Sequence, residues 1–270
     1  MKKKRFAITN MILALFVLTV VLPIAVMIVW TVTERWAWPD LVPQVLSLRA
    51  LSEIFRRSEA LAKLFASSIM ISAAVAMASV VIGTLTARAL VLYEFWGKRM
   101  MYFFTVLPFM VPATVFAMGV QISFIKLGLN NTVAGVVLSH LICSLPYAVR
   151  LMMDGTAAVG DRLEEQARVL GASMGQAFFR VTFPLLVPVI LSSFSMAYIV
   201  SFSQYFLTLL IGGGQVKTFT IVMVPYLQGG DRNIACAYSV IFLGITLAVF
   251  ALFEKIAGRW GKNTDTEFYT

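Results

Sequence analysis

The chain has 270 residues, of which 60% are hydrophobic and only 13% are charged, and its formal net charge is +9. An ordinary soluble domain carries about 25% charged residues. This composition, with a mean hydropathy of +0.86, therefore excludes a soluble enzyme, a disordered chain and a nucleic-acid-binding module. The excess of Lys and Arg is typical of loops that flank membrane helices.

Six runs without Asp, Glu, Lys or Arg divide the chain. Each run meets or exceeds the roughly 20 apolar residues that a helix needs to cross the hydrocarbon core of a bilayer. The runs cover residues 6–33, 64–87, 100–125, 127–149, 181–216 and 233–253. We therefore predict an all-α membrane protein with six transmembrane helices.

The first run follows four basic residues, 2–5, as a signal peptide would. A signal core has only about 7 to 15 apolar residues, whereas this run is longer and continues past Pro23, so we interpret it as a retained span. An even number of spans places both termini on one side, and more than half of the Lys and Arg fall on that side. The positive-inside rule then predicts a multi-pass protein with both termini in the cytoplasm.

The connection between the fourth and fifth runs has a helical pattern that is interrupted once. Asp161 and Glu164 fit a capping box at the start of a first helix. Gly171 can end that helix because glycine adopts the left-handed conformation without a Cβ clash. Ser173 and Gln176 fit a second capping box. We predict a helix, a glycine elbow and a short second helix that ends before Pro184.

This connection carries more apolar surface than a water-exposed loop needs. Two interpretations remain open: the helix lies against its own membrane domain, or its apolar residues anchor a soluble partner inside a charged rim. The apolar residues are Ala167, Val169, Leu170, Ala172, Met174, Ala177, Phe178 and Phe179.

Six residues of the connection resemble the Glu-Ala-Ala loop of the membrane permease subunits of binding-protein-dependent ABC importers. The six are Glu165, Ala167, Gly171, Val181, Phe183 and Pro184, while Gln166 replaces an alanine of the usual Glu-Ala-Ala triplet. The resemblance extends from about residue 61 to 253 and implies a type I permease fold. It assigns residues 1–60 to a leading helix and external loop, 61–253 to the permease core and 254–270 to a cytoplasmic tail.

The resemblance also implies a division of labour. The short helix of the loop, with Phe178, would be a cytoplasmic coupling helix between helices four and five that fits a cleft in an ATP-binding subunit. The expected partners are a second permease subunit, either a copy or a homologue, two ATP-binding subunits, an external solute-binding protein and the lipid of a bacterial inner membrane, without nucleic acid. ATP and magnesium would bind the partner subunit, so we expect no cofactor in this chain and no enzymatic activity of its own.

The sequence itself agrees with that division. A nucleotide-binding loop needs G-x-x-x-x-G-K-[ST], and the nearest segment, 212–218, has Val216 before Lys217. Spans without charged interior residues also disfavour an ion-coupled carrier, which commonly places ionisable groups there. The alternative is a self-contained secondary carrier, or a membrane scaffold whose loop binds another protein.

Neutral polar residues in the spans are the candidates for a translocation path. Because Ser201, Gln204, Tyr205 and Thr208 recur at helical spacing, we expect one polar stripe on helix five, joined by Gln121 from helix three. The alternative for each residue is a hydrogen bond that joins two helices. The similarity to permeases for polyamines, thiamine, iron and phosphonates is general, and neutral Ser203 and Gln204 disfavour a polyamine.

No metal or catalytic site is predicted. His140 is the only histidine, and a single histidine in a helix is more often a packed residue than a ligand; Cys143 and Cys236 are isolated within spans. Pro108 and Pro112 in helix three and Pro146 in helix four are expected to kink their helices.

Overall fold

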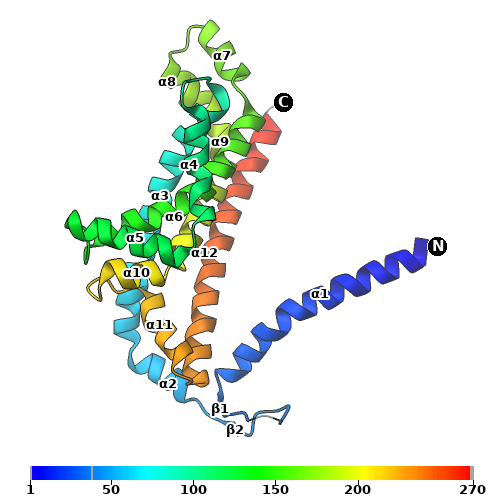
Figure 1. The fold of residues 1–270 in the computed structure, drawn as a ribbon. Helices are drawn as coiled ribbons and strands as arrows, with labels where there is room; N and C mark the ends of the chain where they lie inside the picture. The colour runs from blue at the N-terminus through cyan, green and yellow to red at the C-terminus, as the bar shows by residue number, and fades with distance from the viewer. Residues whose placement is uncertain (1, 38, 268–270) are drawn as a thin grey trace. The chain divides into compact units, whose positions relative to one another are not determined.

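The computed structural model describes residues 2–37 and 39–267, and their structure is almost entirely helical (Figure 1). A short antiparallel hairpin interrupts the helices near the start of the chain. The elements in order are α1 (Lys2–Trp30), β1 (Thr33–Arg35), β2 (Val45–Leu46), α2 (Arg49–Arg56), α3 (Ser58–Leu92), α4 (Lys98–Met110), α5 (Ala113–Lys126), α6 (Val133–Val159), α7 (Arg162–Val169), α8 (Met174–Ala177), the π-helix η1 (Phe178–Thr182), α9 (Phe183–Phe202), α10 (Phe206–Gly212), α11 (Phe219–Gln228) and α12 (Arg232–Glu267).

The chain forms two compact units. The first comprises the chain up to Lys63 together with Val222–Ile245. In this unit the side chain of Asn233 accepts from the Ala50 backbone N–H at 3.1 Å and donates to the carbonyl oxygens of Trp30 and Thr31 at 3.1 and 3.0 Å. One buried amide therefore fixes the start of α12 to α2 and to the end of α1.

The second unit comprises Leu64–Ile221 together with the chain from Thr246 onward, and it contains the main apolar core. Residues from α3, α5, α6, α10 and the turn after α10 form that core: Ile71, Val75, Ala117, Phe124, Val136, Leu207, Ile211 and Val216. Helices α6 and α9 approach closely at Gly155, where an added Cβ would lie 2.7 Å from a methyl group of Val189. Small residues at such crossings allow membrane helices to pack closely.

Within residues 2–37 and 39–267, five helical segments are long and apolar enough to cross a membrane, and the count reaches six if one bent pair forms a single span. The five are Thr9–Trp30, Ser58–Leu92, Val133–Val159, Met174–Phe202 and Arg232–Ile256. The bent pair is Lys98–Pro108 with Ala113–Lys126, whose axes differ by 109°. The all-α membrane architecture is confirmed.

The third expected span is broken rather than merely kinked. Val111 between α4 and α5 is extended, with φ −94° and ψ 127°, and Pro112 is the N-cap residue of α5. Proline disfavours the helical region for the residue before it and offers no backbone N–H to continue the ladder. The local sequence therefore explains why the helix stops there.

The expectation that the short second helix ends before Pro184 is wrong. The helix continues from α8 through η1 into α9, with Pro184 in the first turn of α9. The proline ring would clash with a carbonyl four residues earlier in a regular helix, and the wider π turn precedes it directly. A continuous helical segment thus leads from the loop into the membrane span Met174–Phe202.

Candidate functional site

Residues 161–184, which we call the docking segment, fold as a helix, an elbow and a second helix. Gly171 has φ +95°, and its N–H donates to the Arg168 carbonyl at 3.0 Å. The Ser173 hydroxyl accepts from the Gln176 N–H at 3.3 Å, while the Gln176 side chain accepts from the Ser173 N–H at 3.0 Å. The predicted glycine elbow and the second capping box are confirmed.

The first predicted capping box is wrong. Asp161 occupies the N-cap position of α7, but its side chain makes no capping hydrogen bond. The Glu164 carboxylate instead points into the protein, where both of its oxygens accept from Nη2 of Arg88 on α3, at 3.0 and 2.9 Å. A largely buried arginine thus outcompetes the local backbone N–H for this carboxylate.

Two further contacts complete this cluster. The Thr182 hydroxyl in η1 donates to Glu164 Oε2 at 2.7 Å. The Arg88 guanidinium lies 4.8 Å from the ring centroid of Phe178, and the exposed fractions of the Arg88 and Glu164 side chains are only 13% and 10%. Sequence reasoning missed Arg88, although it is the first charged residue after the second apolar run.

The tip of the docking segment is apolar and uncovered. The exposed fractions reach 87% for Val169, 88% for Leu170, 62% for Met174 and 66% for Phe179. Their exposure disfavours the interpretation that this surface lies against the chain's own membrane domain. Contiguous exposed apolar residues with charged neighbours are typical of a protein interaction site.

The residues of the Glu-Ala-Ala pattern surround this tip. Glu165 and Gly171 are exposed, Ala167, Val181 and Pro184 are half-buried, and Phe183 is 37% exposed. The rings of Phe178, Phe179 and Phe183 pack together, with centroids 5.0 to 6.2 Å apart. These residues lie together at one end of the second unit (Figure 1), and their role in docking stays a prediction.

The expected polar stripe on helix five does not exist as one helical face. Helix α9 ends at Phe202 and α10 begins at Phe206, so Ser201 and Thr208 lie on different helices. His140 from α6 joins them, because its Nδ1 lies 3.0 Å from Ser201 Oγ and its Nε2 lies 2.9 Å from Thr208 Oγ1. All three side chains are buried.

The other three path candidates lie at or near the break in helix five. Gln204 and Tyr205 are half-buried within the break. The Gln204 backbone carbonyl accepts from the hydroxyls of Thr208 and Thr220, at 2.8 and 3.2 Å. Gln121 on α5 donates through Nε2 to the Leu210 carbonyl at 3.2 Å. The break is thus held by polar contacts, and a role of these residues in solute passage stays a prediction.

His140→Leu is expected to destabilise the helix-five region. The substitution leaves the buried hydroxyls of Ser201 and Thr208 without their shared partner, and each interhelical hydrogen bond in a membrane protein contributes about 0.6 to 2 kcal/mol. The melting temperature of the purified protein in detergent should fall by several degrees. Ser139→Ala is the matched control, since the Ser139 hydroxyl donates within α6 to the Val136 carbonyl; an equal loss in both variants would contradict the role of His140.

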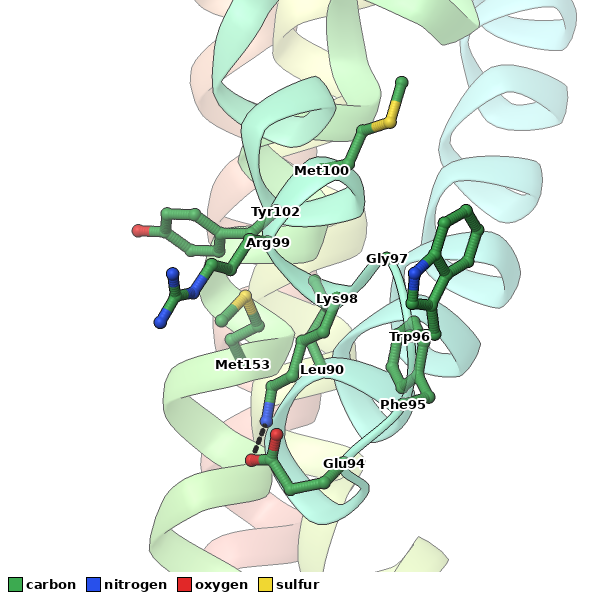
Figure 2. Close-up of a pocket in the computed structure, with 10 residues that line it drawn as sticks. All are labelled: Leu90, Glu94, Phe95, Trp96, Gly97, Lys98, Arg99, Met100, Tyr102 and Met153. Carbon is green, nitrogen blue, oxygen red and sulfur yellow. Dashed lines mark hydrogen bonds and ion pairs between the residues drawn. The ribbon is translucent and has the colours of Figure 1, made fainter.

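A cavity of about 780 Å³ lies where α3 turns into α4. Figure 2 shows Trp96 and Arg99 on opposite sides of the turn, while Lys98 and Glu94 form an ion pair of 2.6 Å with each other. The polar groups that line this cavity therefore do not point toward a common position. Within the described ranges, no group of three or more His, Cys, Asp and Glu could hold a metal ion.

Comparison with known proteins gives consistent matches. The family described as "Binding-protein-dependent transport system inner membrane component" matches residues 79–261. A molybdate/tungstate transport system permease protein of Pyrococcus abyssi is 27% identical over 193 residues, 72% of this chain and 77% of the relative. A probable sulfate transport system permease protein of Nephroselmis olivacea is 27% identical over 264 residues, 86% of this chain and 91% of the relative.

A solved structure matches the fold. A chain of a bacterial ABC transporter involved in the import of the acidic polysaccharide alginate superposes with a TM-score of 0.71 and 18% identity. The match covers 93% of this chain and 96% of that one. The architecture described above is therefore that of a known permease fold.

Proposed function

Because the chain belongs to the family of inner membrane components of binding-protein-dependent transport systems, and is thus a permease subunit of an ABC importer, we propose that its docking segment receives the ATP-binding subunit. The protein forms half of a translocation path with a second permease subunit, and an external binding protein delivers the solute. Two separate subunits bind ATP and magnesium and hydrolyse the nucleotide.

The uncovered apolar tip carries this proposal. Val169 and Leu170 project from a segment whose backbone is fixed by the Gly171 elbow, the Ser173 capping box and the buried Glu164. An apolar anchor on a preorganised segment is the arrangement that binds a partner with little loss of conformational entropy. Exposed Glu165 and Arg168 supply a charged rim.

We propose that this tip lies in the cytoplasm together with the C-terminus. Within the second unit, the end of α12 and α7 lie toward the same end of the view in Figure 1, and the positive-inside rule supports a cytoplasmic location of that end. An ATP-binding subunit must meet its nucleotide there. In this orientation, the break between α9 and α10 lies in the half of the membrane domain that is farther from the cytoplasm.

The solute is selected largely by the external binding protein. The related permeases are named for molybdate or tungstate and for sulfate, and the structural neighbour belongs to an alginate importer. Neutral residues at the break, including Gln204, disfavour a polycationic solute because no carboxylate there compensates its charge. We infer that uncharged amide and hydroxyl groups line the translocation path.

Co-purification tests the docking role. The ATP-binding subunit of the same importer should be retained by the wild-type protein in detergent and lost when Val169→Glu and Leu170→Glu are combined, because two charges then enter an apolar interface. Leu41→Glu is the matched control, since Leu41 is 87% exposed in the hairpin connection, remote in sequence from the docking segment.

Two outcomes would contradict the proposal. A wild-type complex that contains no ATP-binding subunit, with uptake that follows an ion gradient, would indicate a secondary carrier. Retention of the subunit by the doubly charged variant would place the docking site elsewhere on the chain.

A further inference from the structure

The ion pair between Arg88 and Glu164 connects elements that the chain itself does not connect. The docking segment is covalently continuous with α6 through Gly160 and with α9 through η1. Helix α3 ends at Leu92, and α4 and α5 follow it before α6 begins. A movement of the docking segment therefore reaches α6 and α9 through the backbone, but it reaches α3 only through side-chain contacts.

Side chains rather than backbones bridge α3 and α7. The two helices enclose a cavity of about 150 Å³, lined by Arg88, Leu92 and Tyr93 on one side and by acidic and basic residues of α7 and its N-cap on the other. A cavity of this size means that close apolar packing does not join the helices at this level. The charged contact of Arg88 with Glu164 spans the gap.

A second contact of α3 lies beside the ion pair but is of a different kind. Ala87 packs in an apolar cluster with Met152 of α6 and Leu186 of α9. Apolar surfaces hold helices together without specifying their relative orientation, because their attraction is non-directional. The charge-assisted contact of one guanidinium nitrogen with both carboxylate oxygens is directional, and Thr182 and Phe178 support it.

The Arg88–Glu164 ion pair is also costly to break within the folded protein. Both side chains are largely withdrawn from water, and a buried charge that loses its partner is strongly disfavoured. The cluster should therefore persist while the docking segment moves, so that α3 moves with it. A rigid contact of this kind can carry a conformational change between distant sites.

We propose that Arg88 and Glu164 are positioning residues that clamp the docking segment to α3, so that ATP-driven movement of the segment also moves the second membrane helix. This inference rests on the proposed function of the docking segment. It adds a link between the ATP-binding subunit and α3, a helix that is not adjacent to the docking segment in the sequence. The clamp makes no contact with nucleotide or solute.

The test replaces the pair without leaving a buried charge. In the variant Arg88→Met with Glu164→Met, apolar side chains fill the site, and replacement of both partners of a buried ion pair often preserves folding. The variant is reconstituted in proteoliposomes with its partner permease, ATP-binding subunits and binding protein. We measure the stimulation of ATP hydrolysis by the binding protein, which requires no knowledge of the solute.

The expected result is an assembled complex whose stimulation is reduced by roughly two- to thirtyfold, the range of coupling effects of residues that contact neither ligand. Arg88→Lys should give an intermediate reduction, because an ammonium keeps the charge but not the planar guanidinium that lies over the Phe178 ring. The matched control is Arg150→Met with Asp154→Met, which removes an exposed ion pair within α6 at 3.5 Å and should leave the stimulation unchanged.

The failures of the two proposals are distinguishable. If the wild-type complex lacks the ATP-binding subunit, the docking role is wrong. If the wild type is stimulated and the double Met variant is stimulated equally, the clamp is wrong and the docking role stands. If the double variant does not assemble, Arg88→Lys decides: reduced stimulation in that variant supports the clamp, and full stimulation contradicts it.

Discussion

Gly171→Val should abolish uptake by the importer although the protein still inserts into the membrane. Gly171 has φ +95°, a conformation that side chains with a Cβ rarely adopt. A left-handed backbone costs an ordinary L-residue about 1 to 2 kcal/mol, and a β-branched residue is disfavoured further. The elbow between α7 and α8 should therefore open, and the apolar tip would lose the shape that the ATP-binding subunit recognises.

The measurement separates folding from docking. The amount of protein in the membrane fraction reports insertion, co-purified ATP-binding subunit reports docking, and uptake of the solute carried by the binding protein reports function. An added Cβ at Gly171 would meet no atom within 4 Å, so any effect comes from the backbone and not from a steric clash. Normal uptake by Gly171→Val would contradict the assignment of this segment.

Two controls isolate the backbone effect. Gly171→Asn should retain most of the activity, because asparagine tolerates the left-handed region better than other residues with a side chain. Gly175→Val places the same side chain four residues later, where φ is not positive and the added Cβ also meets nothing within 4 Å. This variant should be affected far less than Gly171→Val.

The accuracy of the sequence predictions depends on the range of the interactions involved. The Gly171 elbow and the Ser173 capping box were predictable because each is decided within about one helical turn. The break before Pro112 follows from a local rule as well, although the sequence indicated only a kink. These features required no knowledge of the rest of the fold.

Features set by distant residues were not predictable in the same way. Glu164 satisfies the local pattern of a capping box, and only the tertiary contact with Arg88, 76 positions away, draws its carboxylate inward. No proline or glycine marks the break between Phe202 and Phe206. Contacts from His140, Gln121 and Thr220 hold that break, and single-sequence periodicity contains no information about them.

The same break separates the path candidates into two groups. Ser201 and Thr208 are buried and share His140, which is the arrangement expected of hydrogen bonds that join helices. Gln204 is half-buried. Within the described part of the chain, its backbone forms hydrogen bonds but its side-chain amide forms none. An amide with two donors and an acceptor is costly to leave against lipid, so we expect Gln204 to face a hydrated path.

Gln204→Leu should therefore abolish uptake, and with it the stimulation of ATP hydrolysis by the binding protein, while the complex still assembles. Leucine has a similar volume and removes every side-chain hydrogen bond of the amide. The backbone carbonyl that accepts from Thr208 and Thr220 is unchanged, so the break itself should persist. Poor assembly of the variant, instead of inactive assembled complex, would indicate a structural glutamine.

Thiol labelling gives an independent check of the same assignment. Gln204→Cys should react with a water-soluble reagent, and its reactivity should change when ATP is bound, because a path alternates between open and closed states during transport. Ser201→Cys and Thr208→Cys are matched controls that should stay unreactive, since the native side chains are 2% and 0% exposed. If Gln204→Cys is unreactive in every nucleotide state, its side chain faces protein or lipid, and the translocation path lies elsewhere in the bundle.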